Sequence, residues 1–330
     1  MTVVQAGVAK SGNYWLYRII QGSLRSADLP HRSFIRDHPI YEEAATWDLS
    51  FAEQAGIDTI DITDDGCFLT VSSAYRAPIT DLGEYFSRAE HVWTHSGWCI
   101  QTPKVLQHAD KAVYLIRDPR DAIISMSRFA FTDYMQRYHP KNESDAAAYL
   151  ENRLYSMTLS WIRHVAGYLR HAVESSIHVV FYERLLHSFD KEYETMLDYL
   201  ELDLSAAKRR EVADSVAFKN MRRSEPSHVR RGRSGQWQEH LTDAQIVQIS
   251  RMAEPMLRLL SYPLAGDTAA EALPSFPEAT TTRTIDAAVR HSRGTLRDKW
   301  VYANTLLRSS RPLSEKIRLG TRFLLHDRGA

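Results

Sequence analysis

The hydrophobic pattern at the start of the chain changes from a continuous apolar run to a helical period. The run starts at Val3 and leads into Lys10-Ser11-Gly12, and the helical face after it is formed by Leu16, Ile19, Ile20 and Leu24. This change predicts a strand, a tight loop and a helix. Such a loop directs backbone N–H groups and a helix N-terminus toward one point, where an anion can bind. Lys10 adds a positive charge to that loop.

Three later apolar runs have the length of buried strands. They cover residues 89–95, 111–116 and 177–182. Asp118 and Pro119 follow the second run. This pair suits the N-cap and the first position of a helix, which we expect to extend to about residue 131.

Helical periods fill much of the remaining chain. They occupy residues 144–173, the stretch after the third strand up to about 199, residues 205–215, and a stretch from a capping box at Thr242 to about 260. Strands that alternate with helices predict an α/β fold, in which a parallel sheet is covered by helices on both faces.

Other stretches lack a regular period. Residues 28–95 are punctuated by Gly, Pro and Asp, and their scattered aromatic residues either complete a minor core or line a ligand pocket. Residues 219–241 predict a basic loop. Residues 265–283 have the composition of a linker, and residues 284–330 form a basic, partly helical C-terminal extension. The sequence thus predicts a main domain over residues 1–264, followed by the linker and the extension.

Composition excludes several classes of protein. The 330 residues are 44% hydrophobic and 25% charged, as in a soluble globular protein with a substantial core. Lys and Arg equal Asp and Glu at 41 each, so we expect no nucleic-acid partner. Cys67 and Cys99 are too few for a disulfide framework and predict a cytoplasmic protein. We expect no signal peptide, and no transmembrane segment because no apolar run approaches ~20 residues.

Charge is distributed unevenly along the chain. Residues 284–330 carry ten Lys or Arg and four Asp or Glu, a net charge of +6 that the rest of the chain balances. This extension could dock on the acidic main domain, pair two subunits in a homodimer, or touch anionic lipid. We favour docking or dimer packing, because no long amphipathic face is evident in the sequence.

The first loop differs from the Walker phosphate loop. Gly7 and Gly12 have the Walker spacing, but Asn13 and Tyr14 follow where Lys and Ser or Thr are required. No hydroxyl is in place to hold Mg²⁺, which argues against a metal-dependent nucleotide hydrolase. Taken alone, Lys10 is equally consistent with a solvated residue in an ordinary strand-to-helix turn.

A second candidate anion site follows the 111–116 run. Arg117 stands at the carboxyl end of this predicted strand, where ligands of open α/β sheets bind, and Ser125 lies two helical turns further on. An arginine fork with a hydroxyl suits a phosphate group. The alternative is a local ion pair between Arg117 and Asp118.

Two further features complete the set of candidates. The basic loop contains Arg230, Arg231 and Gly232, which could close over an anionic ligand or remain a solvated surface. His95 ends the 89–95 run, close to the expected position of Lys10. A histidine titrates near neutral pH and suits the role of a general base.

In this order, the pieces resemble the sulfotransferases that use 3′-phosphoadenosine 5′-phosphosulfate (PAPS), in particular the cytosolic type. Ala9 to Leu16 is similar to their 5′-phosphosulfate loop, and Tyr114 to Ser125 to their 3′-phosphate motif. Thr94-His95 stands where the family keeps its catalytic histidine. Later similarities are Phe181-Tyr182-Glu183, Phe218-Lys219-Asn220-Met221, and Arg230-Arg231-Gly232 with Gly235 and Trp237. The resemblance covers about residues 2–262.

The resemblance implies a P-loop-like, three-layer α/β/α fold with a central parallel sheet. It also implies transfer of a sulfuryl group from PAPS to a hydroxyl, or less often an amine, of a small-molecule, carbohydrate or lipid acceptor. The product nucleotide is 3′-phosphoadenosine 5′-phosphate (PAP), and no metal is required. The implied catalytic residues are His95 as general base, Lys10 and Ser125. The implied nucleotide contacts are Lys10, Ser11, Gly12, Asn13, Tyr14, Trp15, Arg117, Ser125, Tyr182, Phe218, Arg230, Arg231 and Gly232.

The chain departs from the family pattern in places. Asn13 and Tyr14 replace two threonines of the loop, Trp93 stands where a lysine often precedes Thr-His, and Val216 replaces a threonine. These departures indicate a divergent, bacterial-type member. Two other functions stay open: a P-loop kinase of small molecules, and a protein that binds PAP or PAPS without catalysis and serves interaction.

Overall fold

The computed structural model describes residues 1–224, 232–264, 273–277, 280–292, 295–308, 313–314 and 316–317. The chain forms two compact units, each taken by itself below. The first comprises Met1–Arg117 and Gly167–Ser234, and the second comprises Asp118–Ala166 and Gly235–Ala330. The predicted arrangement of a main domain, linker and extension stays a prediction.

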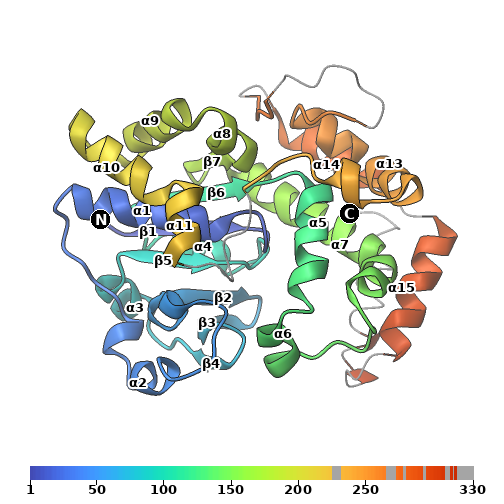
Figure 1. Cartoon of the computed structure of the whole chain (residues 1–330), viewed down its shortest axis with the longest axis horizontal. Coiled ribbons are helices and arrows are strands. Elements are labelled where there is room, and N and C mark those ends of the chain that lie inside the picture. Colours follow the sequence, from blue (N-terminus) through green and yellow to red (C-terminus); the bar gives the residue numbers. More distant parts are fainter. Residues whose placement is uncertain are drawn as a thin grey trace. The chain divides into compact units, whose positions relative to one another are not determined.

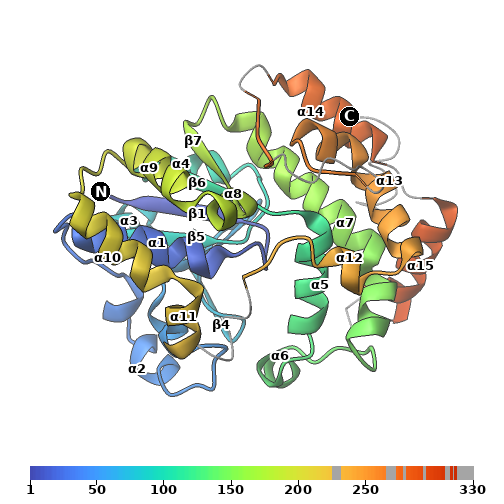
Figure 2. The ribbon, with the colours of Figure 1, turned by 45° about the horizontal axis from the view of Figure 1, so that its top comes forward.

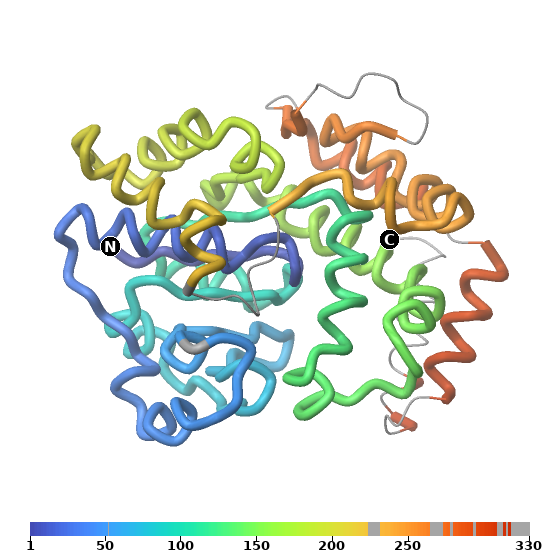
Figure 3. The backbone as a smooth tube through the Cα atoms, viewed as in Figure 1, coloured from blue at the N-terminus to red at the C-terminus, as the bar shows by residue number. Residues whose placement is uncertain are grey.

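The first unit is built on a seven-stranded sheet with the order β4-β3-β2-β5-β1-β6-β7. The strands are β1 (Val3–Gly7), β2 (Thr59–Thr63), β3 (Gly66–Val71), β4 (Tyr75–Pro78), β5 (His91–Thr94), β6 (Lys111–Ile116) and β7 (Ile177–Phe181). From β2 to β7 in this order neighbours are parallel, whereas β3 pairs antiparallel with both β2 and β4. Segments far apart in sequence thus lie side by side (Figure 3). Ala6 of β1 pairs with Thr94 on one side and Tyr114 on the other.

Helices cover one face of this sheet through a large apolar core. They are α1 (Asn13–Ser26), α8 (Tyr182–His187), α9 (Phe189–Leu200), α10 (Ala206–Val216) and α11 (Phe218–Ser224), grouped together in Figures 1 and 2. The predicted face of α1 is confirmed, because Leu16, Ile19, Ile20 and Leu24 are all buried against the sheet. Val3 of β1 and Val113 of β6 meet them from the strands.

The opposite face has a second core formed by shorter elements. These are η1 (Ile35–Asp37), α2 (Ile40–Ala44), η2 (Ala52–Gly56), α3 (Leu82–Arg88) and α4 (Thr102–Leu106). Val4 of β1 and Val92 of β5 pack here against Ile35 and Tyr85. Together the two cores make three layers, so the predicted α/β/α fold is confirmed. The sheet is mixed rather than wholly parallel, because residues 59–78 form an antiparallel ribbon at its edge.

The second unit is helical in its described residues. It contains α5 (Pro119–Phe129), α6 (Asp133–Tyr138), α12 (Trp237–His240), α13 (Asp243–Leu259), α14 (Thr282–His291), α15 (Leu296–Arg308) and most of α7 (Ala146–His171). The predicted caps are confirmed: Asp118 accepts from the Arg120 N–H, and Thr242 forms a capping box with Gln245. Among the described helices, none is long and apolar enough to cross a membrane.

Candidate active site

The loop between β1 and α1 is shaped by two residues in left-handed backbone conformation. Lys10 has φ 70° and Gly12 has φ 98°. A β-carbon at Gly12 would lie 2.5 Å from the Tyr182 ring, so this position requires glycine. Gly12 is also the N-cap of α1 and provides no side-chain cap. The first N–H groups of the helix are therefore oriented to bind an anion.

A buried amide braces this loop from the inside. Asn13 donates from Nδ2 to the Val8 carbonyl at 2.8 Å, and its own carbonyl accepts from Gln5 Nε2 at 2.8 Å. A β-carbon at Gly7 would lie only 2.4 Å from Asn13 Oδ1, so a larger residue at position 7 would collide with this amide. The Asn13 side chain is thus engaged within the loop. Ser11 is fully buried, and its hydroxyl has no hydrogen-bond partner among the described residues.

His95 follows β5 and is bonded to the end of β1. Its Nδ1 lies 2.8 Å from the Gly7 carbonyl oxygen. A carbonyl only accepts, so Nδ1 carries the proton and Nε2 is the basic nitrogen. The indole of Trp93 meets the imidazole edge-on, with ring centroids 5.3 Å apart. The strand pairing of Ala6 with Thr94 explains why His95 and the Lys10 loop lie at one edge of the sheet.

The surroundings of His95 favour its neutral form. Desolvation and, to a lesser extent, the Lys10 charge lower its pKa, the bond to Gly7 raises it, and the net result is a pKa lowered from 6.5 to about 4. The residue is nevertheless exposed to solvent. Water therefore screens part of the effect, and the downward direction is what matters for the chemistry.

Arg117 joins three segments of the first unit. Its Nη1 donates to the Lys10 carbonyl at 3.2 Å, and its Nη2 donates to the Arg233 carbonyl at 3.1 Å. The guanidinium carbon also lies 4.3 Å from the centre of the Tyr182 ring. The side chain is buried, so its positive charge is fixed at the edge where β1 and β6 end.

An aromatic group lies beside this charge. Trp15 and Phe218 contact directly, with centroids 4.5 Å apart, and the indole of Trp15 donates to the Val216 carbonyl at 3.0 Å. Tyr182 meets Trp15 edge-on at 5.7 Å. A β-carbon at Gly232 would lie 2.4 Å from the Phe218 ring. The backbone at Gly232, in the described part of the basic loop, therefore packs directly on Phe218, and only glycine permits so close an approach.

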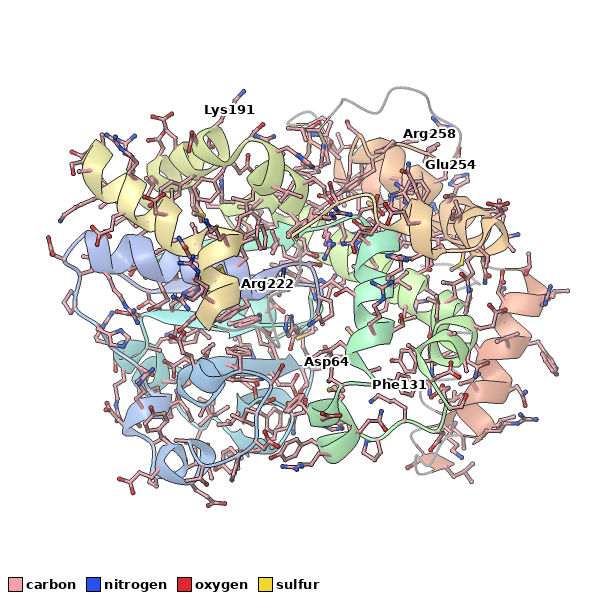
Figure 4. The ribbon with its side chains drawn as sticks, in the orientation of Figure 1. Asp64, Phe131, Lys191, Arg222, Glu254 and Arg258 are labelled. Atoms are coloured by element: carbon pink, nitrogen blue, oxygen red, sulfur yellow. The ribbon has the colours of Figure 1, made fainter. Side chains whose placement is uncertain are left out.

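The basic loop is only partly described. Residues 219–224, which the sequence assigns to the loop, belong to α11, whose exposed Arg222 is labelled in Figure 4. The loop boundaries were thus predicted wrongly, because α11 and α12 occupy both ends of that stretch. Arg230 and Arg231 lie outside the described residues.

The second unit holds the rest of the Tyr114–Ser125 motif. Arg120 is fully buried, pairs with Asp118 at 2.6 Å, and lies over the Trp237 ring at 3.9 Å. Asp121 accepts from the backbone N–H of Gly235 at 2.9 Å and of Trp237 at 3.0 Å. Asp121 and Arg120 thus hold the chain at Gly235 and Trp237, a few residues after Gly232. Sequence reasoning did not assign them this role.

Ser125 lies on α5 in the second unit and is partly exposed. Its proposed phosphate contact stays a prediction. In the described residues, no group of three or more His, Cys, Asp or Glu side chains could hold a metal ion.

Polar contacts tie the residue after His95 to the edge ribbon. The Ser96 hydroxyl accepts from the Ile62 N–H at 2.7 Å and donates to Asp61 at 3.2 Å. Asp61 in turn pairs with Arg76 at 2.9 Å, and the Arg76 guanidinium lies 3.2 Å above the Phe68 ring. The stretch that looked irregular in the sequence thus contacts Ser96, the residue that follows His95, through Ile62 and Asp61.

The comparison with known families agrees with this geometry. Residues 2–261 match the sulfotransferase domain family. The chain belongs to the sulfotransferase family, and the resemblance inferred from its motifs is confirmed.

Curated relatives are distant. The chain is 23% identical to a rabbit (Oryctolagus cuniculus) amine sulfotransferase over 49% of this chain and 59% of that protein. It is 21% identical to cytosolic sulfotransferase 1 of Danio rerio over 59% of this chain and 68% of that protein. With sulfotransferase 2B1 of Rattus norvegicus, 23% identity extends over 77% of this chain and 70% of the relative. The match thus spans less than two thirds of the rabbit protein.

Solved structures share the fold. Mouse sulfotransferase SULT7A1 complexed with PAP superposes with a TM-score of 0.52 at 17% identity, covering 78% of this chain and 84% of that one. Retinol dehydratase, in complex with androsterone and inactive cofactor PAP, gives 0.52 at 17% identity, covering 80% and 82%. At this identity the likeness establishes the fold alone.

Proposed function

We propose that the protein transfers a sulfuryl group from PAPS to a hydroxyl, less often an amine, of a small-molecule, carbohydrate or lipid acceptor. The observation that carries this proposal is the bond between His95 Nδ1 and the Gly7 carbonyl, because it links a neutral base to the anion-binding loop. PAPS supplies an activated sulfuryl group when bound, and PAP remains after transfer. We expect the reaction to take place in the cytoplasm and without a metal.

The residues present fit a nucleotide with anionic groups at both ends. Ser11 and the N–H groups of Gly12, Asn13, Tyr14 and Trp15 would hold the 5′ side, supported by the uncapped start of α1 and the buried Ser11 hydroxyl. A buried hydroxyl normally has a hydrogen-bond partner, and a 5′-phosphate oxygen would provide one for Ser11.

The 3′ phosphate would be held by cations and hydroxyls. Arg117, Ser125, Arg230, Arg231, Gly232 and Tyr182 take this role in our proposal. The buried guanidinium of Arg117, which lies 3.2 Å from the Lys10 carbonyl, supports a second anion position close to the first. Trp15 and Phe218 would present their shared aromatic face to adenine.

His95 would take the acceptor proton at Nε2 while the acceptor oxygen bonds to sulfur. Lys10 would stabilise negative charge on the phosphate oxygen that separates from sulfur. A positioned base contributes ~10²–10⁴-fold to the rate. The lowered pKa of His95 keeps Nε2 able to accept a proton at neutral pH.

The test is sulfate transfer by the His95→Ala variant, with labelled PAPS and a panel of acceptors. Transfer should fall by ~10²-fold or more, while PAP binding measured by calorimetry is retained. His108→Ala is the matched control, because this exposed histidine of the first unit should leave both quantities unchanged. Near-normal transfer by His95→Ala would remove His95 as the base.

Lys10 provides a second readout. Because its charge lowers the pKa of His95, Lys10→Ala should move the acid limb of kcat/KM to higher pH as well as reduce kcat. A change in KM alone would contradict its proposed role.

The same assays separate the other functions. Tight binding of ATP with Mg²⁺ in preference to PAP would indicate a small-molecule kinase. Binding of PAP without transfer to any acceptor would indicate a binding protein. We favour the sulfotransferase because the loop lacks the Lys-Ser/Thr pair that Mg²⁺-nucleotide sites require.

A further inference from the structure

The helix α15 exposes an apolar stripe along one side. Leu296, Trp300, Ala303 and Leu307 are all exposed, with exposed fractions of 85% for Leu296, 67% for Trp300 and 66% for Leu307. Their spacing of four, three and four residues places them on one face of the helix. We call these four side chains the α15 stripe. Leu313 and Ile317, further along the chain, are also exposed.

The opposite face of α15 is packed within the second unit. Asp298 is buried and accepts from Arg251 and Gln248 of α13 at 2.9 and 2.7 Å. Tyr302 is buried and lies 6.2 Å, centroid to centroid, from Tyr155 of α7. The orientation of α15 is thus fixed by side chains outside the stripe, and the stripe faces outward.

The exposed charges next to the stripe are cationic. Arg297 and Arg308 are exposed and flank it on one side. Asp298 is the acidic residue of α15, and it is buried in its pair with Arg251. By contrast, the outer face of α13 carries a mixed ion pair of Glu254 and Arg258, seen together in Figure 4.

We infer that the α15 stripe binds the surface of an anionic lipid bilayer. An interfacial helix lays leucine and tryptophan side chains into the boundary between headgroups and acyl chains, with Lys and Arg at its sides. The stripe and its flanking cations have this arrangement. Neither a wholly polar surface nor an uncharged apolar face would favour anionic lipid in particular. This inference goes beyond the proposed transfer reaction and does not depend on it.

A second copy of the chain fits the stripe less well. Two α15 helices packed stripe to stripe would bring Arg297 and Arg308 of one copy next to those of the other. Asp298 could not compensate, because its carboxylate is buried and already paired. Phosphate and carboxylate headgroups satisfy the same cations without this repulsion. Charge complementarity therefore selects lipid over self-association.

The experiment is flotation of the full-length protein with vesicles. One preparation is phosphatidylcholine alone. The other contains about 30 mol% phosphatidylglycerol, which makes the vesicle surface anionic. We expect binding to the anionic vesicles and a decrease when the salt concentration is raised. Arg297→Gln with Arg308→Gln should reduce binding on the order of 25-fold, since each cation near an anionic surface contributes about fivefold.

Apolar variants test the stripe itself. Trp300→Ala should weaken vesicle binding on the order of tenfold or more. Leu307→Ser should weaken it as well, whereas Val247→Ser, at an exposed apolar position of α13, is the matched control and should not. Circular dichroism of each variant checks that the buried face still holds the helix.

Two results would overturn the inference. One is a failure of the native protein to bind anionic vesicles. The other is a dimer in sedimentation velocity that dissociates in Trp300→Ala while vesicle binding is unaffected by the same change. Sulfate transfer in solution, measured alongside, reports on the proposed reaction separately.

Discussion

The carboxyl group of Asp58 gives a sharp prediction about pH and stability. It is buried beside β5, accepts from the Ile35 N–H at 2.7 Å and bonds to Ser33. Burial raises its pKa from 3.8 to about 7. A rise of about 3 units corresponds to about 4 kcal/mol. Because the folded protein holds this proton more tightly, that stability is present below pH 3.8 and lost as pH rises through 7.

The change Asp58→Asn removes the charge and keeps an oxygen that can accept the Ile35 bond. The variant should match the native protein near pH 4 and exceed its unfolding free energy by about 4 kcal/mol above pH 7. His91 has the opposite linkage. Its burial lowers its pKa from 6.5 to about 3, so its contribution is present above pH 6.5 and lost as pH falls. In the Asp58→Asn variant the opposing effect of Asp58 is absent, so the unfolding free energy should rise steeply from about pH 4 to 6.5 because of His91.

The assay is urea unfolding at about pH 4.5, 6 and 8, which spans the range over which Asp58 should lose its proton. Asp65→Asn is the matched control, because Asp65 is exposed in the turn between β2 and β3. This change should alter stability little at any pH. A difference between Asp58→Asn and the native protein that is constant across pH would refute the reasoning.

Three further predictions concern the loop and its arginine. Gly12→Ala forces a β-carbon to within 2.5 Å of the Tyr182 ring at positive φ, so it should cost ~1–3 kcal/mol in thermal unfolding and weaken PAP binding. Asn13→Ala removes the 2.8 Å bond to the Val8 carbonyl, and we expect a loss of ~1–3 kcal/mol with a lower kcat; unchanged kcat would show that the brace does not position the base. Arg117→Ala should weaken PAP binding ~10–100-fold while affecting the 3′-dephospho nucleotide far less, by calorimetry.

The parallel part of the fold could be predicted from the sequence, and the edge ribbon was missed. Strand β6 matches its predicted range of 111–116, and β1, β5 and β7 lie within theirs, because buried strands read as apolar runs. Residues 59–71 carry a weaker signal. Apolar side chains alternate there, as at Ile60 and Ile62, on both sides of the two-residue turn Asp64-Asp65. Alternation on both sides of a short polar turn indicates a hairpin.

The site could be predicted only where side chains supply the chemistry. Lys10, Arg117 and His95 are recognisable by type and order, and the strand pairing explains why they share one edge. The Gly7 carbonyl that binds His95 is a backbone group, so no residue type in the sequence indicates this contact. The resemblance implies that Asn13 contacts the nucleotide, which stays a prediction; the bond from its side-chain amide to the Val8 carbonyl is a contact that only the fold reveals.

The edge ribbon has a consequence for how this protein could be remodelled. It joins the sheet through β2 alone, so β3 and β4 lie outside the strands that carry the loop, the histidine and the arginine. Insertions or exchanges in residues 64–78 would leave the register of β5, β1 and β6 intact. If the proposed transfer reaction holds, a library confined to that segment, with Asp61 and Ser96 retained, would vary the surroundings of Ser96 without changing the strands that carry the loop, the histidine and the arginine.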